Sequence, residues 1–249
     1  MMRHLHLESV HSTNSYLLDW LRKDPDLPSL TVVTAYDQTA GRGQKGNHWE
    51  AAAGENITLS LLLRPDRELA LAPFDLNVVT SLALADLLEE YLTNQVEIKW
   101  PNDLLVEGKR KIAGILTENA WLGNSWDYSI IGVGLNVCQK SFGSYAPPAT
   151  SMVLEGYQPD QNWHDVLVRE TIERIEERLA GLADDSASLR EEYHSHLFRY
   201  RQPGCSYRTA EGTTFRGMLL GVHPNGLLDI EDEASGEVRS FAFKEVQFW

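Results

Sequence analysis

Residues 99–116 read KWPNDLLVEGKRKIAGIL, which is the most informative stretch of the chain. Two apolar runs, residues 104–106 and 111–118, flank Glu107-Gly108-Lys109, which supplies a turn between two strands. Such a grouping suits a binding site for anions, because the predicted hairpin carries an Asn-Asp pair and several cations: Lys99, Lys109, Arg110 and Lys111.

Positive charge is concentrated in this hairpin and in a glycine-rich segment upstream. Residues 41–49 and 99–111 hold six of the 22 Lys and Arg residues against two acids, in a chain with a formal net charge of -14. Because clefts lined by one sign of charge focus the field on an oppositely charged ligand, we expect a ligand with phosphate or carboxylate groups. The acidic balance of the whole chain disfavours a nucleic-acid-binding surface, so we expect no nucleic acid partner.

The bulk properties indicate a globular protein. A chain of 249 residues with 43% apolar residues can form one large domain, or a catalytic domain with a small appendage. Cys138 and Cys205 match no metal spacing and predict neither a disulfide scaffold nor a zinc site. No signal peptide and no run of about 18 apolar residues is present, so we expect a soluble, cytoplasmic protein without a membrane partner.

Strands and helices are expected along the first 200 residues. Ser12-Thr13-Asn14 predicts the capped start of a helix, and residues 31–36 and 57–63 predict strands that flank a long loop. Residues 75–92 and the four-three repeat over 168–182 predict helices, whereas further strands are expected at 96–100, 104–106, 111–118 and 128–137. We therefore expect an α+β fold with a mixed sheet.

The pattern changes after residue 200. Pro203 and Gly204 interrupt the chain, and short strands are expected around residue 207 and at 218–222, 227–230 and 238–243. Asn225-Gly226 and Ser235-Gly236 are hairpin turn signals between them. We predict a domain of residues 1–200 followed by a small all-β domain of residues 201–249, which we expect to be a barrel.

The glycine loop satisfies G-x-G-x-x-G through Gly41, Gly43 and Gly46. A dinucleotide fingerprint must open a helix in a βαβ unit, whereas this loop leads into a strand, and the motifs of protein kinases are absent. A flexible surface loop and a ligand-covering loop remain; Arg42 and Lys45 between the glycines favour the second.

Two further motifs each allow a structural and a functional interpretation. Ser12-Thr13-Asn14 caps a helix, whose N-terminus can also contact a ligand, and Gly132-Val133-Gly134-Leu135-Asn136 is either a bulge or a site of close ligand approach. We interpret the following histidines as surface residues: His4, His6, His11, His194 and His196.

In their order and spacing these motifs resemble the biotin protein ligase family. The likeness covers nearly the whole chain, and the matching segments are Ser12-Thr13-Asn14, Gln38-Thr39-Ala40-Gly41-Arg42-Gly43 with Trp49, Lys99-Trp100-Pro101-Asn102-Asp103, Lys111-Ile112-Ala113-Gly114-Ile115 and Gly132-Val133-Gly134-Leu135-Asn136. The resemblance implies a catalytic domain like that of class II aminoacyl-tRNA synthetases, followed by an SH3-like β-barrel.

The resemblance also implies a reaction. Biotin and ATP, with Mg²⁺, would give biotinyl-5'-AMP and pyrophosphate, and biotin would then pass to a lysine of an apo biotin carboxyl carrier protein. The sequence leaves open which carrier is modified and whether the chain forms a homodimer. Bifunctional members carry a DNA-binding segment before the Ser-Thr-Asn motif, which begins here at residue 12, so we expect no repressor role.

The same resemblance assigns residues. Lys111 would lie between the biotin carboxylate and the α-phosphate as the principal catalytic residue, and Arg42 would supply a second cation. The implied biotin-binding residues are Ser12, Thr13, Asn14, Gln38, Arg42, Gly43, Gln44, Lys111 and Gly114. The implied nucleotide-binding residues are Arg42, Trp49, Asn102, Asp103, Lys111, Gly134 and Asn136, with Asp103 contacting magnesium through water. Gln44 stands where some members have arginine, which removes one charge.

Two alternatives remain. A lipoate or octanoate ligase would share the fold and the adenylate chemistry, but the polar set Ser12-Thr13-Asn14 and Gln38 favours biotin. A non-enzymatic biotin sensor is disfavoured by the presence of Lys111.

Overall fold

The computed structural model describes residues 3–65 and 72–249, and its largest element is a seven-stranded mixed sheet. The strand order is β1-β2-β3-β7-β6-β5-β4, in which β1 and β2 are parallel and the other neighbours are antiparallel. The strands are β1 (His4–Val10), β2 (Val32–Gln38), β3 (Asn56–Leu63), β4 (Val96–Lys99), β5 (Asp103–Val106), β6 (Arg110–Leu122) and β7 (Ser125–Asn136). The predicted mixed sheet of an α+β fold is thus confirmed.

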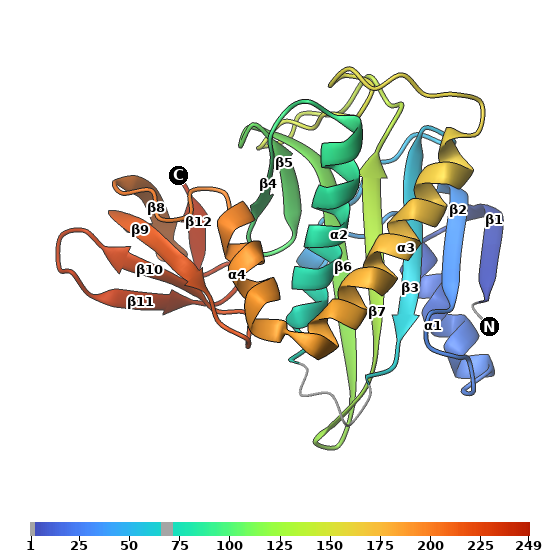
Figure 1. Cartoon of the computed structure of the whole chain (residues 1–249), viewed down its shortest axis with the longest axis horizontal. Helices are drawn as coiled ribbons and strands as arrows, with labels where there is room; N and C mark the ends of the chain where they lie inside the picture. The colour runs from blue at the N-terminus through green and yellow to red at the C-terminus, as the bar shows by residue number, and fades with distance from the viewer. Residues whose placement is uncertain (1–2, 66–71) are drawn as a thin grey trace.

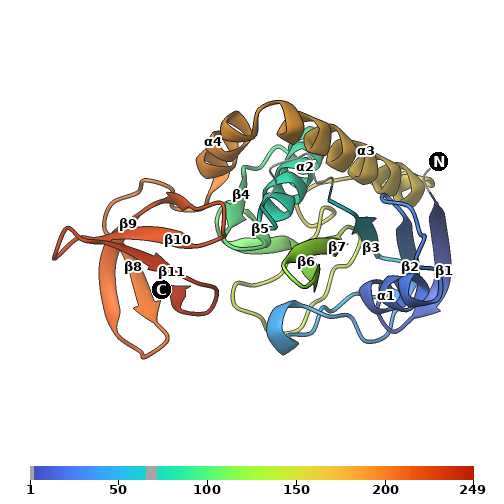
Figure 2. The same cartoon turned by 90° about the horizontal axis from the view of Figure 1, so that it is seen from below.

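Helices cover both faces of this sheet. Figures 1 and 2 show α2 (Asp75–Tyr91) and α3 (Trp163–Asp184) on one face and α1 (Thr13–Lys23) on the other. Within the described residues, no helix is long and apolar enough to cross a membrane.

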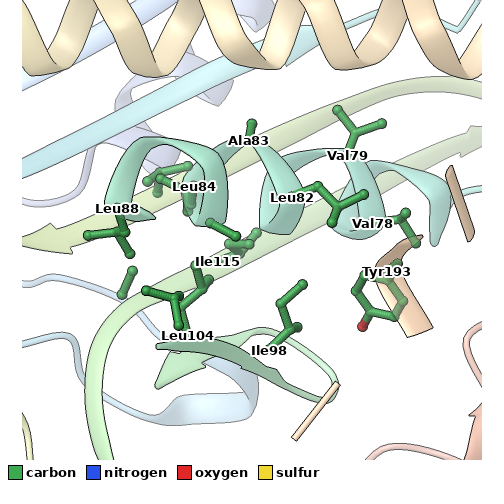
Figure 3. Close-up of a cluster of buried hydrophobic side chains, with 14 of the residues drawn as sticks. Val78, Val79, Leu82, Ala83, Leu84, Leu88, Ile98, Leu104, Ile115 and Tyr193 are labelled. Atoms are coloured by element: carbon green, nitrogen blue, oxygen red, sulfur yellow. The ribbon is translucent and has the colours of Figure 1, made fainter. Parts of the chain in front are cut away.

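The main core lies between the sheet and α2. Figure 3 shows Leu82 and Leu88 of α2 close to Ile98, Leu104 and Ile115 of the sheet. Most residues of α2 are buried, because α3 and α4 (Ser186–His196) pack on its remaining sides. On the opposite face, Leu17 and Leu21 of α1 form a smaller core against β2, β3 and β7.

The predicted central hairpin is confirmed. β5 and β6 pair around the turn at Glu107 and Gly108, both of which have positive φ. β4 pairs with β5 so that Lys99 lies opposite Asp103, across a turn that contains a cis peptide bond between Trp100 and Pro101. The cationic residues predicted to cluster therefore lie on β4 (Lys99), in the turn (Lys109) and at the start of β6 (Arg110 and Lys111), with Asp103 on β5 between them.

Three elements were not expected from the sequence. β1 alternates histidine and leucine at the sheet edge, and its exposed positions hide the apolar signal. Only Leu189 and Tyr193 of α4 are buried, so its helical period is weak, and β12 (Val246–Phe248) is only three residues long.

The C-terminal strands form one five-stranded antiparallel sheet, in the order β11-β10-β9-β8-β12. They are β8 (Cys205–Thr209), β9 (Thr214–Val222), β10 (Leu228–Asp232) and β11 (Val238–Phe241), together with β12. The predicted strands are present, and the turns at Asn225-Gly226 and Ser235-Gly236 join β9 to β10 and β10 to β11 as expected.

The histidines divide into two groups. His4, His6 and His11 are exposed, as predicted, but the prediction for His194 and His196 is wrong, because both are half-buried. Nε2 of His194 accepts a hydrogen bond from the backbone N–H of Val222 at 3.0 Å. This contact joins α4 to β9, and it explains why a polar residue at that position faces inward.

His164, at the start of α3, gives the fold a predicted pH dependence. Its ring lies 5.7 Å from the ring of His6, and His4 and His6 both contact Oγ1 of Thr34. Burial lowers the pKa of His164 below its ordinary value of 6.5; Asp165 opposes this shift and His6 adds to it. Because the unfolded chain then binds the proton more tightly, stability is present above pH 6.5 and is lost as the pH falls below it.

We therefore expect the urea concentration at the midpoint of unfolding to decrease as the pH is lowered from about 7.5 to about 5.5. In His164→Gln this decrease should be smaller. His11→Gln, at an exposed position, is the control. The same pH dependence in His164→Gln and in the wild type would contradict this account.

Candidate active site

A cleft of about 560 Å³ lies between the glycine loop, the central strands and the C-terminal sheet. It brings together most of the residues singled out from the sequence: Ser12, Thr13, Asn14, Gln38, Arg42, Gly43, Gln44, Trp49, Asn102, Asp103, Lys111, Gly114 and Gly134. Asn136 is the exception, since it is buried and its amide nitrogen donates to the Thr150 carbonyl at 2.9 Å. Motifs spread over more than 120 residues thus converge on one site.

Lys111 projects into the cleft from the start of β6. Its Nζ lies 2.6 Å from Oδ1 of Asp103, and its side chain is 27% exposed. The pairing of β5 and β6 shifts register beside it, leaving Ile112 as an extra residue that is fully buried. A bulge re-aims side chains, so Lys111 can face the cleft while Ile112 and Ala113 both pack in the core.

The backbone of Lys111 is fixed by the segment after β7. Its N–H donates to the Pro148 carbonyl and its carbonyl accepts from the Thr150 N–H, both at 2.8 Å. A residue that sequence reasoning missed, Glu155, holds this segment. Its carboxylate accepts two hydrogen bonds from Arg110, at 2.8 and 2.9 Å, one from Thr150 at 2.6 Å and one from Asn94 at 2.7 Å.

Glu155 remains ionised in this setting. Burial opposes its charge, but the hydrogen bonds from Arg110, Thr150 and Asn94 outweigh burial, so its pKa lies below the ordinary value. Arg110 precedes Lys111 in the sequence and Thr150 donates to its backbone carbonyl, so Glu155 acts on the site by positioning Lys111. Its sequence neighbourhood contains no signal of this role.

The floor of the cleft is made of glycines that are covered by Trp49. Gly114 and Gly134 are cross-strand partners in β6 and β7. A Cβ on Gly134 would overlap Cε2 and Cζ2 of the Trp49 ring, and one on Gly114 would come within 3.0 Å of it. The indole Nε1 is buried against Gly134 and has no hydrogen-bond partner among the described residues.

The glycine loop is a tight turn and not a helix start. Arg42 and His48 form a β-bridge, and Gly43 N–H donates to the Asn47 carbonyl at 2.7 Å. Only the short 3-10 turn Gln44–Gly46 lies between them, which confirms that the loop is not a dinucleotide fingerprint. The side chain of Lys45 lies outside the described part.

Arg42 is held by partners outside the loop. Its guanidinium donates to Oγ of Ser15 at 3.0 Å and forms an ion pair with Glu118 of β6. Glu118 also accepts from Nδ2 of Asn14 at 2.9 Å. An anion in the cleft would therefore have to compete with Glu118 for Arg42.

One end of the cleft is polar but uncharged. Gln38 Oε1 accepts from both the backbone N–H and the hydroxyl of Thr13, at 2.9 and 3.1 Å. Ser60, which the sequence did not indicate, donates to Thr13 at 2.7 Å and contacts Asn14. Ser12 occupies the N-cap position of α1 without a side-chain capping bond, so the expected cap is wrong in detail: Gln38 satisfies the first amide of the helix.

The other end of the cleft is bordered by charged and aromatic residues. Asn102 ties its turn to β6, because Nδ2 donates to the Ile115 carbonyl at 2.8 Å. Lys99, which lines the cleft beside it, was in the cationic hairpin but not among the predicted site residues. Burial lowers the pKa of Lys99, Asp103 opposes this shift, and the charges of Lys111 and Arg199 add to it.

Residues of the C-terminal sheet complete this end. Trp100 Nε1 donates to the Gly226 carbonyl at 3.1 Å, and the Trp100 and Phe243 rings lie 6.3 Å apart. Phe243 and residues 246–249 line the cleft together with the central strands. No group of three or more His, Cys, Asp or Glu side chains that could hold a metal occurs within residues 3–65 and 72–249.

Comparisons with known proteins bear on this site. The model of the biotin/lipoate A/B protein ligase family matches residues 6–136. The bifunctional ligase/repressor BirA of Bacillus spizizenii (strain ATCC 23059 / NRRL B-14472 / W23) is 38% identical over 141 residues, which are 57% of this chain and 42% of that protein. The biotin--[acetyl-CoA-carboxylase] ligase of Paracoccus denitrificans is 38% identical over 150 residues, 59% of this chain and 60% of the relative. The matches thus span less than two thirds of these relatives.

The fold has solved counterparts. The structure of biotin protein ligase from Aquifex aeolicus in complex with biotin and ATP superposes with a TM-score of 0.77 and 24% sequence identity, covering 98% of this chain and 97% of that one. At this identity the likeness establishes the fold alone.

Proposed function

Because the chain belongs to the biotin/lipoate A/B protein ligase family, we propose that it is an ATP-dependent biotin protein ligase. It activates biotin to biotinyl-5'-AMP, releases pyrophosphate, and transfers biotin to a lysine of an apo biotin carboxyl carrier protein. The observation that carries this proposal is the cleft itself. It combines an uncharged polar end, at Thr13 and Gln38, with an ammonium group at Lys111, as an acid with a neutral polar ring requires.

Activation brings two anions together. An oxygen of the biotin carboxylate attacks the α-phosphorus of ATP, and the bond to the pyrophosphate oxygen breaks. Lys111 offsets the repulsion between the carboxylate and the phosphate and stabilises the charge that develops in the transition state. In the second step the acceptor lysine amine attacks the acyl carbon, AMP leaves with the phosphate oxygen, and the amine proton passes to solvent.

Selectivity arises at the polar end of the cleft. The ureido ring of biotin has one carbonyl and two N–H groups, which Ser12, Thr13 and Gln38 can pair with, and Asn14 is held beside them by Ser60. Analogues that lack the ring would leave these groups unpaired, which is costly. Gly43, Gln44 and Gly114 border the acyl chain, with Gln44 Oε1 buried and without a partner among the described residues.

The nucleotide is assigned to the remaining walls of the cleft. Trp49 offers an aromatic face over the Gly114–Gly134 floor, and Asn102 and Asp103 border the same space. Asn136 supports this wall from behind through Thr150. Mg²⁺ needs only one or two carboxylates in addition to substrate phosphates, so Asp103 fits as its contact through water. The ion would neutralise phosphate charge when bound.

The finer fold assignments belong to the same proposal. We assign residues 1–200 to a catalytic domain like that of class II aminoacyl-tRNA synthetases and residues 201–249 to an SH3-like barrel. We assign the protein to the cytoplasm, where carrier and ATP are available. The acceptor carrier is the only macromolecular partner that the mechanism requires.

The deciding experiment is magnesium-dependent pyrophosphate release from ATP with biotin, lipoate or octanoate as the acid, with and without an apo carrier domain. Release with biotin that becomes sustained turnover and labels the carrier would support the proposal. Release only with lipoate or octanoate would assign the protein to the sister activity of the family, and binding without release would identify a sensor.

A change at Arg42 tests the role of the glycine loop. We expect Arg42→Ala to weaken biotin binding and to speed release of the adenylate by about 10- to 100-fold, because a charge-assisted contact is lost. A calorimetric titration and a filter-binding measurement of adenylate release would show both. Arg22→Ala, on the exposed side of α1, is the control. Unchanged affinity together with unchanged release would contradict the role of Arg42.

A further inference from the structure

Lys99 is a cation of the cleft to which the reaction described above gives no role. It is the last residue of β4, it is half-buried, and it lines the cleft next to Asp103. The ammonium of Lys111 is already paired with Asp103 at 2.6 Å, whereas Lys99 forms no ion pair with any described carboxylate. Its charge is thus available to a ligand. Resting on the proposed function, we infer that Lys99 binds the β- and γ-phosphates of ATP and holds them as the leaving pyrophosphate.

The orientation that biotin and ATP would take along the cleft supports this assignment. Biotin would enter from the Thr13–Gln38 end, so its carboxylate meets the α-phosphate at Lys111. The nucleoside and the β- and γ-phosphates of ATP are attached to different oxygens of the α-phosphate. The uncharged base and the polyanionic tail therefore extend from Lys111 in different directions. The Trp49 ring, which lies on the glycine floor and lines the cleft, suits stacking with a flat base, whereas the wall with Lys99 suits the polyanion.

Local electrostatics favour the same end. The charges of Lys111 and Arg199 both repel that of Lys99, and Asp103 is the carboxylate that attracts it. Mutual repulsion of cations is relieved when a polyanion binds, so the unliganded protein carries a positive surplus where phosphate charge would arrive.

The C-terminal sheet holds Lys99 in place. Its Nζ lies 5.8 Å from the ring centroid of Phe248 in β12, a cation–π arrangement. Figure 2 shows the C-terminal sheet beside β4 and β5, so this contact spans the two sheets. Phe248 therefore directs the ammonium but leaves its charge in place, whereas a carboxylate partner would neutralise that charge.

The test compares Lys99→Met, which keeps the length of the side chain and removes its charge, with Lys109→Met. Lys109 is exposed and lies on the same cationic hairpin, but outside the cleft. Calorimetry with ATP, pyrophosphate and AMP, each without biotin, separates the parts of the nucleotide. We expect Lys99→Met to weaken ATP and pyrophosphate binding by about 10- to 100-fold, the usual effect of losing a charge-assisted contact, and to leave AMP binding within about twofold.

Turnover adds a second readout. Under the same conditions the KM for ATP should rise in Lys99→Met, the KM for biotin should stay within about twofold, and Lys99→Arg should restore most of the loss. A merely structural role would lower AMP and ATP affinity equally, and either that result or unchanged ATP affinity would overturn the inference. If the wild type binds ATP and activates lipoate instead of biotin, the proposed function fails while the role of Lys99 stands.

Discussion

Replacing Lys111 by alanine is expected to slow adenylate formation by about 100- to 1000-fold, the usual scale for losing one preorganised transition-state contact. The ammonium lies beside Asp103 in the cleft, where we propose that the acid and the nucleotide meet. Without it, the carboxylate and the α-phosphate would approach each other with no cation between them. Rapid quench of a single turnover with labelled ATP measures this step directly.

Biotin affinity and a control variant separate an effect on the chemical step from an effect on binding. Biotin affinity should fall much less than the rate, because the contacts at Thr13 and Gln38 remain. Lys109→Ala, two residues earlier and exposed, should behave like the wild type. A Lys111→Ala enzyme that turns over at near-normal rate would exclude Lys111 as the principal catalytic residue.

Gly134→Ala is expected to reduce ATP affinity by at least about 100-fold, which corresponds to about 3 kcal/mol. The added Cβ would overlap the Trp49 ring and lie 2.7 Å from its Nε1, so the indole would have to leave the glycine floor. Overpacking of this kind also costs about 1–3 kcal/mol of stability. Calorimetry with ATP and a urea unfolding curve measure the two effects.

Gly181→Ala is the matched control, because a Cβ at this position in α3 meets no atom within 4 Å. There we expect a gain of about 0.5–1 kcal/mol in unfolding free energy and unchanged ATP affinity, since alanine is the better helix former. If Gly134→Ala also left ATP affinity unchanged, Trp49 and the glycine floor would not form the nucleotide wall.

The parts of the site that could be predicted share one property: their signal is local. The hairpin around Gly108 and the glycine loop are specified by neighbouring residues, which fix turns and strands before any tertiary contact forms. The order of these motifs along the chain then identified the family.

The missed residues act across long separations. Glu155 bonds to Arg110, 45 positions away, and Ser60 contacts Asn14, 46 positions away. Glu118 pairs with Arg42 over 76 positions. A lone glutamate or serine in an unremarkable setting reveals its partner only when the fold is known. The same holds for His194, whose inward position depends on β9.

The pairing of β12 with β8 has a consequence for biosynthesis. Val246 lies opposite Thr209 and Phe248 opposite Tyr207, so the wall that directs Lys99 forms only after residues 246–248 have left the ribosome. A nascent chain can already contain the glycine loop, Lys111 and the whole central sheet while this wall is missing. The order of synthesis therefore places the closing of this wall after the formation of the central sheet.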